Sequence, residues 1–572
     1  MCCVRTLIVA VALLFMTACS VPDKPVVKVN ASGAESAVTF QWFEYEGRDQ
    51  LFEPKLPDGF YQNPILAGFY PDPSIVRVDD TFYMVNSSFS YFPGIPIFRS
   101  TDLVNWQSLG YVLNRPSQLS VEGAGMSRGI YAPTIRYHQG TFYVITTGVE
   151  AGGNFIVTSS DPSGPWSDPY PLPEINGIDP SMFFADNGKV YITHNGSPVG
   201  EPLYNGHRAI WMWEFDLNAM AVIDGSGRVV VDGGVDISQQ PIWIEGPHLY
   251  KVADWYYLLC AEGGTAENHS AVVFRSRSLD GEFVPFEGNP ILTQRHLDPQ
   301  RENPVATTGH ADFVQNIDGS WWAVFLATRN YDQRFYNTGR ETFLLPVEWH
   351  DGWPRILDGD NAVPHRLKAP AKVQRTNNAD VMTGNFTWRE DFNDTVLSWH
   401  WNTLRTGNSR WYSLNAGAGI RMEPQSLTLT DLQQPSFIAR RQQHQTYRAT
   451  TALSLPEVSG VQAGISAFQS ERAHYFFFVE KSHEGYRLGL ELVDQGVRRM
   501  LKTQPLPFAV PVTHIEMEIT AEQGRISFSY FHEDGARTVM AENLDATVLS
   551  TQRAGGFVGS FVGLHTRMSV GH

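Results

Sequence analysis

The sequence predicts an all-β protein in which a five-bladed β-propeller is followed by a jelly-roll-like β-sandwich. Two observations lead to this prediction. Between residues 60 and 365 one strand–turn–strand unit recurs five times, and no helical period of 3.6 residues runs through this segment. From about residue 385 to residue 572, short alternating strands are separated by frequent turns. Repeated multi-stranded units are typical of propeller blades, and short alternating strands are typical of a sandwich.

Each repeated unit begins with a short apolar approach and continues through a turn into an aromatic strand. The five approaches are residues 70–75, 131–135, 178–182, 244–249 and 309–313. The aromatic strands that follow them are residues 81–85, 141–145, 189–193, 255–259 and 320–324. Turn residues such as Asn187-Gly188 precede these strands, as tight hairpins require. A single two-sheet sandwich would not predict one motif at five such places.

Acidic residues stand at equivalent positions of these units. With Asp72, Ala132, Asp179, Glu245 and His310 as reference points, the units are separated by 60, 47, 66 and 65 residues. The innermost strand of every propeller blade faces the central axis, so these five positions should converge at one end of it. Three carboxylates and a histidine in one small volume do not suit a structural core, because buried charges need partners. The pattern therefore indicates a functional site.

Such a set of carboxylates is suited to the hydrolysis of a glycosidic bond. One carboxyl group protonates the leaving oxygen, while another activates water or attacks the sugar. A third carboxylate raises the pKa of the acid by repulsion, so that the acid stays protonated at neutral pH. Alternatives remain at this point: Glu245 alone could be a turn residue or a salt-bridge partner, and the acids with His310 could ligate calcium or zinc. Arg340 is either a cationic neighbour of the site or a surface salt-bridge residue.

Longer motifs occur in a fixed order along the chain. They are residues 63–74 (NPILAGFYPDPS), 92–94 (FPG), 100–106 (STDLVNW), 115–119 (RPSQL), 177–181 (GIDPS), 245–250 (EGPHLY), 261–265 (AEGGT), 309–312 (GHAD) and 339–342 (GRET). In the order and spacing of these motifs the chain resembles glycoside hydrolase family 43, specifically its two-domain β-xylosidases and α-L-arabinofuranosidases. The resemblance covers nearly the whole mature chain.

The resemblance implies an inverting hydrolase with Asp72 as general base and Glu245 as general acid. Asp179 would tune the pKa of the acid and orient it. Arg340 and His310 match family residues that line the sugar site, and the arginine would contact the terminal sugar. Inversion requires a water molecule between base and sugar, so the carboxyl groups of base and acid should lie roughly 6.5–9.5 Å apart.

Aromatic residues are expected to form the walls of the sugar site. By the resemblance, Phe89 and Tyr131 would be apolar walls, although the family's xylosidases commonly carry Trp where Tyr131 stands. In relatives an aromatic residue of the sandwich helps to close the pocket, and Phe557 and Phe561 are the candidates here. The alternative is that both phenylalanines belong only to the sandwich core. Closure of one end would favour exo-action on a terminal pentose.

A strand pattern ahead of the propeller is out of its usual place. The sandwich of the family usually ends in a strand of the type Ala-x-Phe-x-Trp-Phe-x-Tyr, and residues 566–572 lack this pattern. Residues 37–46 have it instead. We hypothesise that the segment 37–50 completes the C-terminal sandwich, as in a circular permutation, since an open sheet edge would otherwise be exposed.

The first residues predict export from the cytoplasm of a bacterium. Residues 1–18 have the pattern of a lipoprotein signal peptide, in which Cys19 would be lipidated and residues 19–36 would form a tether. Cleavage near this point with plain secretion is the alternative. We expect an outer-membrane lipoprotein of the cell envelope, anchored through Cys19. The net charge of −17 argues against nucleic acid or an anionic membrane surface as the main partner.

The expected activity is exo-acting release of terminal β-D-xylose from xylan-derived oligosaccharides of the plant cell wall. The alternative is an α-L-arabinofuranosidase that removes arabinose side chains, and a non-catalytic glycan-binding protein is a further alternative. A binder has no need of Asp72, Asp179, Glu245 and Arg340 together, which favours an enzyme. No cofactor is expected to be required, although the resemblance allows a structural calcium near His310.

Overall fold

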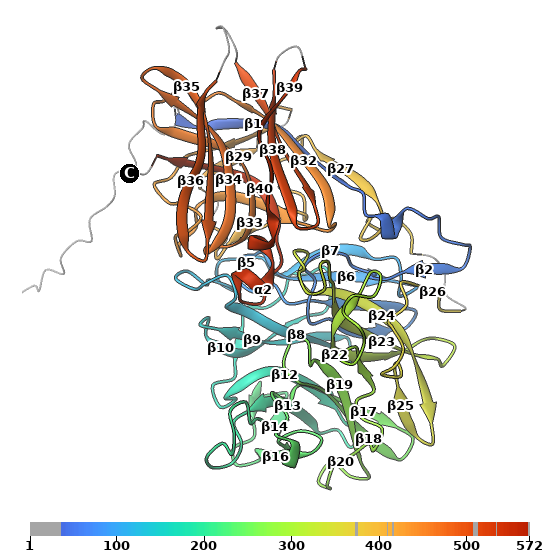
Figure 1. Cartoon of the computed structure of the whole chain (residues 1–572). Helices are drawn as coiled ribbons and strands as arrows, with labels where there is room; N and C mark the ends of the chain where they lie inside the picture. The colour runs from blue at the N-terminus through green and yellow to red at the C-terminus, as the bar shows by residue number, and fades with distance from the viewer. Residues whose placement is uncertain are drawn as a thin grey trace, which may run out of the picture.

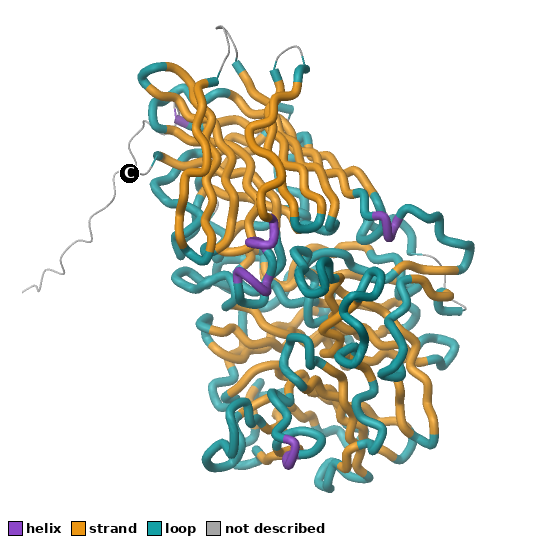
Figure 2. The backbone as a smooth tube through the Cα atoms, in the orientation of Figure 1, coloured by secondary structure: helices purple, strands orange, loops and turns teal. Residues whose placement is uncertain are grey.

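The computed structural model describes residues 36–371, 376–408, 410–414, 417–506, 513–532 and 535–569. They form two all-β bodies, with the sandwich at the top and the propeller at the bottom of Figure 1. Strands and loops dominate both bodies (Figure 2), so the predicted fold class is confirmed. The predicted signal peptide (residues 1–18), Cys19 and the predicted tether as far as residue 35 lie outside the described residues. Within the described ranges, no helix has the length and apolar character needed to cross a membrane.

Five antiparallel sheets form the propeller. Blade one consists of β3 (Ser74–Val78), β4 (Thr81–Val85), β6 (Gly94–Ser100) and β7 (Gln107–Leu113). Blade two consists of β8 (Gly129–His138), β9 (Thr141–Val149), β10 (Gly153–Ser159) and β11 (Tyr170–Pro171). Blade three consists of β12 (Gly177–Phe184), β13 (Val190–Gly196), β14 (Ala209–Asp216), β15 (Ala221–Val222) and β16 (Arg228–Asp232).

The last two blades follow the same plan. Blade four consists of β17 (Glu245–Val252), β18 (Trp255–Glu262), β19 (Ser270–Ser276), β20 (Val284–Pro285) and β21 (Leu292–Thr293). Blade five consists of β22 (Val305–Gln315), β23 (Trp321–Arg329), β24 (Glu341–His350) and β25 (Trp353–Arg355). Short helical turns elsewhere in the chain are η1 (Gln50–Phe52), η2 (Ile237–Gln239), η3 (Ala546–Leu549) and α2 (Thr551–Ala554).

The apolar core of the propeller lies between neighbouring blades. Ile75 and Phe98 of blade one pack with Trp322 and Leu344 of blade five, which closes the ring. Equivalent apolar clusters join blades one and two, two and three, three and four, and four and five. The faces of each sheet pack against neighbouring blades. Polar side chains lie instead at the axis, where the innermost strands begin.

Two packed sheets form the sandwich. One contains β29 (Tyr412–Leu414), β30 (Ile420–Met422), β1 (Val38–Gly47), β32 (Thr446–Ser454), β37 (His514–Glu522), β38 (Arg525–Phe531) and β39 (Arg537–Asp545), with β27 (Phe386–Glu390) also paired to β1. The other contains β31 (Ser436–Arg441), β40 (Phe561–Met568), β33 (Val461–Ser470), β34 (Ala473–Ser482), β35 (Gly485–Asp494) and β36 (Val497–Pro505). Two small pairs join distant segments: β2 (Phe60–Gln62) with β26 (Arg366–Lys368), and β5 (Tyr91–Phe92) with β28 (Thr403–Leu404).

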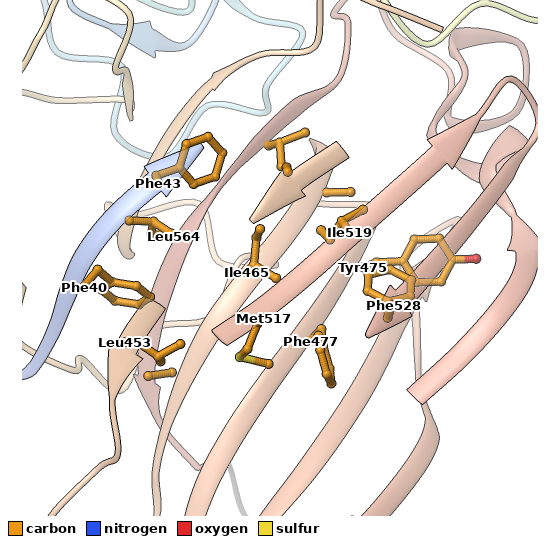
Figure 3. Close-up of a cluster of buried hydrophobic side chains, with 14 of the residues drawn as sticks. Phe40, Phe43, Leu453, Ile465, Tyr475, Phe477, Met517, Ile519, Phe528 and Leu564 are labelled. Atoms are coloured by element: carbon orange, nitrogen blue, oxygen red, sulfur yellow. The ribbon is translucent and has the colours of Figure 1, made fainter. Parts of the chain in front are cut away.

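The N-terminal strand β1 lies inside the first sandwich sheet. It pairs with β32 on one side and with β27 and β30 on the other, all antiparallel. Its apolar side chains alternate inward, and Phe40 and Phe43 point toward Leu453 and Leu564 in Figure 3. The sandwich core is therefore assembled from both ends of the chain, with the propeller between them in sequence.

Deletion of residues 31–50 is expected to destabilise the sandwich, because the deletion removes an interior strand and its buried phenylalanines. Phe43→Ala alone should lower the free energy of unfolding by about 3–5 kcal/mol. Differential scanning calorimetry would measure both effects. The matched control is Gln41→Ala at an exposed position of the same strand. Unchanged melting of the sandwich in the deletion variant would contradict the structural role of β1.

The two bodies are joined by a buried ionic network and by an apolar cluster. Arg329 of blade five donates to Asp49 of the N-terminal segment at 2.7 Å and to Glu341 at 2.7 Å. The same guanidinium donates to the backbone oxygen of Gln443 in the sandwich at 2.9 Å. The apolar cluster packs propeller residues such as Phe69 against residues of the sandwich. These contacts fix the sandwich relative to the end of the propeller that carries the acidic residues.

Candidate active site

The acidic positions lie at irregularities of the innermost strands. Asp72 precedes β3, and Asp179, Glu245 and His310 lie on β12, β17 and β22. The pairing register shifts at the bulges of these three strands. Asp72, Asp179 and His310 have φ values of 51°, 56° and 51°, in the left-handed region. Bulges and left-handed residues re-aim side chains, and such strain is concentrated at functional sites. The strands are thus interrupted where they present these side chains.

One cavity of about 690 Å³ contains the predicted residues. Eight of the nine predicted catalytic and substrate-binding residues line it: Asp72, Phe89, Tyr131, Asp179, Glu245, His310, Arg340 and Phe557. The five repeated units therefore meet here, as the repeat predicted, and Phe557 adds a sixth segment from the sandwich.

Asp72 is held as a buried ion pair. Arg340 Nη1 donates to Asp72 Oδ1 at 2.8 Å, and Ser87 Oγ donates to Asp72 Oδ2 at 2.6 Å. Arg340 is also buried, so it is not a surface salt-bridge residue. Its Nη1 also donates to Thr265 Oγ1 at 3.2 Å. Both carboxylate oxygens of Asp72 accept a hydrogen bond, which fixes the orientation of the carboxylate.

Glu245 has the properties of a proton donor. Burial and the negative charge of Asp72 raise its pKa to about 7, while Arg340 and Arg208 oppose the rise. Burial and the charge of Glu245 also raise the pKa of Asp179 well above its usual range. Because this repulsion is reciprocal, ionised Asp179 disfavours ionisation of Glu245. Ionisation of either carboxyl group therefore disfavours ionisation of the other.

His310 packs against the backbone beside Glu245. A Cβ atom on Gly246 would lie 2.9 Å from His310 Cε1, so the close approach requires a glycine at position 246. Burial lowers the pKa of His310, which favours the neutral imidazole. A neutral imidazole can donate and accept one hydrogen bond each, which suits contact with sugar hydroxyl groups.

Three aromatic rings form one wall of the cavity. The ring centroids of Phe89 and Tyr131 lie 4.9 Å apart, and those of Phe89 and Phe557 lie 6.2 Å apart. Ser127 holds both sides of this wall: its backbone oxygen accepts from Tyr131 Oη at 2.7 Å, and its Oγ accepts from the Phe557 backbone N–H at 2.9 Å. Phe557, 38% exposed, comes from the loop before β40 and brings the sandwich into the site.

The expectation for Phe561 was wrong. Its side chain is fully buried and stacks on Tyr91 with ring centroids 3.8 Å apart. It belongs to the apolar cluster between propeller and sandwich and does not line the cavity. The reason is its position: Phe561 is the first residue of β40 and is held by sheet packing, whereas Phe557 lies in the preceding loop.

The comparisons with known proteins agree with this site. The family model "Glycosyl hydrolases family 43" matches residues 61–354. The model described as the beta xylosidase C-terminal Concanavalin A-like domain matches residues 389–569. The chain belongs to glycoside hydrolase family 43. It is therefore a glycosidase.

Similar proteins match this family 43 enzyme over most of their length. The "Xylosidase/arabinosidase" of Butyrivibrio fibrisolvens is 38% identical over 88% of this chain and 95% of its own. The "Non-reducing end alpha-L-arabinofuranosidase" of Bacteroides ovatus is 35% identical over 88% of this chain and 91% of its own. The crystal structure of a GH43_12 protein retrieved from a capybara gut metagenome has a TM-score of 0.88 and 40% identity, covering 93% of this chain and 100% of that one.

Several residues of the family 43 site were missed by the sequence reasoning. Arg208 and Trp243 line the cavity, as does Thr265. Thr265 lies in the recognised motif 261–265, and Trp243 stands two residues before Glu245. Their positions in the sequence could therefore have indicated that both belong to the site. Arg208 and Ser127 had no such indication, because only the folded loops bring them to the site.

Two residues after His310, Asp312 forms an ion pair with Arg136 in the family 43 propeller. Asp312 accepts hydrogen bonds from Arg136 at 3.0 Å and from Ser74 at 2.7 Å, and Tyr250 also donates to it. In the described part of the chain, no group of three or more His, Cys, Asp and Glu residues could hold a metal ion. The oxygens of Asp312 are therefore engaged by this cation and these hydroxyl groups.

Phe557→Ala is expected to raise the KM of the family 43 enzyme for small glycosides about two- to tenfold, since aromatic pairs contribute about 0.5–1.5 kcal/mol beyond their buried area. The kcat should change less, because Phe557 lies in the wall and not among the carboxyl groups. Steady-state kinetics would measure both values. Phe60→Ala, at an exposed phenylalanine that does not line the cavity, is the control. An unchanged KM in Phe557→Ala would contradict the contact with substrate.

Proposed function

We propose that this enzyme releases terminal β-D-xylose from xylan-derived oligosaccharides by an exo-acting, inverting mechanism. One observation carries the proposal: a single cavity holds Asp72 in an ion pair and Glu245 with its pKa raised to about 7. One carboxyl group is thus held ready to accept a proton and the other to donate one. This division of roles is what glycoside hydrolysis by two carboxyl groups requires.

The proposed reaction is a direct displacement. Asp72 would take a proton from a water molecule as that water attacks the anomeric carbon. Glu245 would give its proton to the departing glycosidic oxygen, so one proton is gained and one is lost in the same step. Asp179 would keep Glu245 protonated and oriented, and Arg340 would hold Asp72 and contact the terminal sugar. Attack from the side opposite the leaving group inverts the configuration.

The sandwich supports exo-action. Arg340 Nη2 lies 3.5 Å from the backbone oxygen of Phe557, and the guanidinium lies 5.5 Å from the centroid of the Phe89 ring. The sugar next to Arg340 would therefore meet the sandwich loop and the aromatic wall. A barrier at this end leaves room for a terminal residue rather than for a chain that continues in both directions. The names of the similar proteins, xylosidase and arabinofuranosidase, are consistent with a terminal pentose.

A second candidate activity is α-L-arabinofuranosidase. Tyr131 is the observation that favours it, since the resemblance places Trp at this position in xylosidases. The deciding assay compares release of 4-nitrophenol from 4-nitrophenyl β-D-xylopyranoside and from 4-nitrophenyl α-L-arabinofuranoside. We expect the xyloside to have the higher kcat/KM. A higher value for the arabinofuranoside would select the second candidate, and glycan binding without any sugar release would indicate a non-catalytic binder.

The chemistry of Asp72 and Glu245 requires no cofactor, because both proton transfers use the protein's own carboxyl groups. Treatment with EDTA should leave kcat/KM unchanged, and a loss restored by calcium would contradict this.

We further propose that the enzyme is an outer-membrane lipoprotein anchored through Cys19. The sequence pattern of residues 1–19 supports this proposal. Expression of the full chain in a bacterial host should place wild-type protein in the membrane fraction and Cys19→Ala outside it.

A further inference from the structure

Arg208 and Trp243 form a stacked pair in the lining of the cavity, at the loops before β14 of blade three and β17 of blade four. The Arg208 guanidinium lies 4.1 Å from the centroid of the Trp243 ring, and both side chains line the same cavity as Glu245. Neither residue is fully buried. The pair belongs to the region of blades three and four, whereas Asp72, Arg340 and the aromatic wall come from blades one, two and five and from the sandwich.

The Arg208 guanidinium has free hydrogen-bonding capacity. Its Nη1 donates to the backbone oxygen of His207 at 2.9 Å, and this is its one hydrogen bond to any described residue. Within the described ranges it has no carboxylate partner at salt-bridge distance. A guanidinium carries five N–H donors, so most of them are available to a ligand. Arg340, by contrast, is committed to Asp72.

The backbone holds Trp243 in a strained but fixed position. Its φ is 54°, which is unusual for a bulky residue, and its N–H donates to the backbone oxygen of Gly206 at 3.0 Å. Tyr204 Oη donates to the backbone oxygen of Pro241 at 2.9 Å. The loop before β14 and the segment before β17 therefore hold each other. Strain maintained in this way marks functional positions.

The role of Glu245 as the acid indicates where the leaving-group sugar lies. Glu245 protonates the oxygen that joins the terminal sugar to the leaving group. If the terminal sugar lies against Asp72, Arg340 and the aromatic wall, the leaving group must lie on the other side of Glu245. Blades three and four, which carry Arg208 and Trp243, lie across the ring of five blades from blade one, which carries Asp72.

We propose that Arg208 and Trp243 form the binding site for the leaving-group sugar and determine the preference for oligosaccharides. This inference rests on the proposed function. The sugar ring packs against the exposed part of the stacked pair, and its hydroxyl groups accept hydrogen bonds from the free guanidinium N–H groups. The bound leaving sugar holds the glycosidic oxygen next to Glu245.

The test compares two substrates of the pentose that the wild-type enzyme releases: a disaccharide that carries this pentose at its non-reducing end, and its glycosyl fluoride. Fluoride is a single atom and cannot occupy the site of a leaving sugar. Trp243→Ala should lower kcat/KM for the disaccharide about tenfold and Arg208→Gln about 10- to 100-fold, with less than a threefold change for the fluoride. Trp255→Ala is the matched control, since its ring stacks on Arg275 at 4.2 Å outside the cavity.

A pH profile distinguishes a role of Arg208 beside Glu245 from a general loss of structure in the variant. The charged and titratable groups that face Glu245 are Asp72, Asp179, His310, Arg340 and Arg208. Because the positive charge of Arg208 lowers the pKa of Glu245, Arg208→Gln should move the alkaline limb of the disaccharide profile to higher pH.

Two results would overturn the assignment: equal loss of kcat/KM on disaccharide and fluoride in both variants, or no loss on the disaccharide. An unmoved alkaline limb in Arg208→Gln would also count against it. Wild-type turnover of the fluoride is measured first. Its absence would refute the proposed function, and the assignment with it, before any variant is compared.

Discussion

Glu245→Gln is expected to lower kcat/KM for an unactivated disaccharide by about 10²–10⁴-fold, while activated aryl glycosides lose far less. A sugar alkoxide is a poor leaving group and needs the proton of Glu245, whereas a nitrophenolate does not. In the wild type, protonated Glu245 is the active form, and its pKa is raised to about 7. Activity on the disaccharide should therefore fall as the pH rises through about 7. Glutamine does not ionise, so this alkaline limb should disappear from the variant.

Parallel kinetics on a nitrophenyl glycoside and on a disaccharide would measure the difference. Glu267→Gln is the control, since it makes the same substitution at an exposed residue that does not line the cavity. Equal losses on the two substrates, with the alkaline limb kept, would count against Glu245 as the acid.

Asp72→Asn should lower kcat/KM by about 10²–10⁴-fold on aryl glycosides and disaccharides alike, because a better leaving group does not replace the base. The substitution also leaves Arg340 buried without its carboxylate, and breaking a buried ion pair costs about 3–5 kcal/mol. The Tm should therefore fall. Because the charge of Asp72 raises the pKa of Glu245, its removal should move the alkaline limb of residual activity to lower pH.

Kinetics and thermal unfolding of Asp72→Asn separate these effects. Ser87→Ala removes the other hydrogen bond to the carboxylate but keeps its charge, and should cost much less activity. Aryl glycoside turnover within tenfold of wild type in folded Asp72→Asn would show that Asp72 is not the base.

The convergence of the carboxylates could be predicted because one motif repeats and a propeller brings equivalent positions to one axis. The repeat located Asp72, Asp179, Glu245 and His310 without any knowledge of their local geometry. The left-handed backbone at Asp72, Asp179 and His310 could not be predicted, since aspartate and histidine adopt this conformation only occasionally. Register and bulges depend on the partner strand, which the local sequence does not contain.

The contacts that loops make at the site could not be predicted from the sequence. Arg208 meets Trp243 only because two loops, 35 residues apart in the chain, pack on each other. Phe557 and Phe561 lie in the same glycine-rich stretch, and nothing in it shows where the loop ends and β40 begins. The structure separates them: one faces the cavity, and the other stacks on Tyr91.

For the N-terminal strand, the sequence pattern predicted the domain that the strand joins but not its neighbours in the sheet. The alternation in residues 37–46 suggested a sandwich strand at the wrong end of the chain. Its place between β32 and β30 could not be read from the pattern, because strand order depends on long-range pairing.

The anomeric configuration of the first product tests the central claim most directly. Proton NMR during hydrolysis of a β-D-xyloside should show α-D-xylose first, with the β anomer appearing later through mutarotation. This result follows if Asp72 activates water while Glu245 protonates the leaving oxygen. The β anomer as first product would indicate a covalent intermediate with retention, which requires carboxyl groups only about 5–5.5 Å apart, and would contradict the assignment of Asp72 as a base.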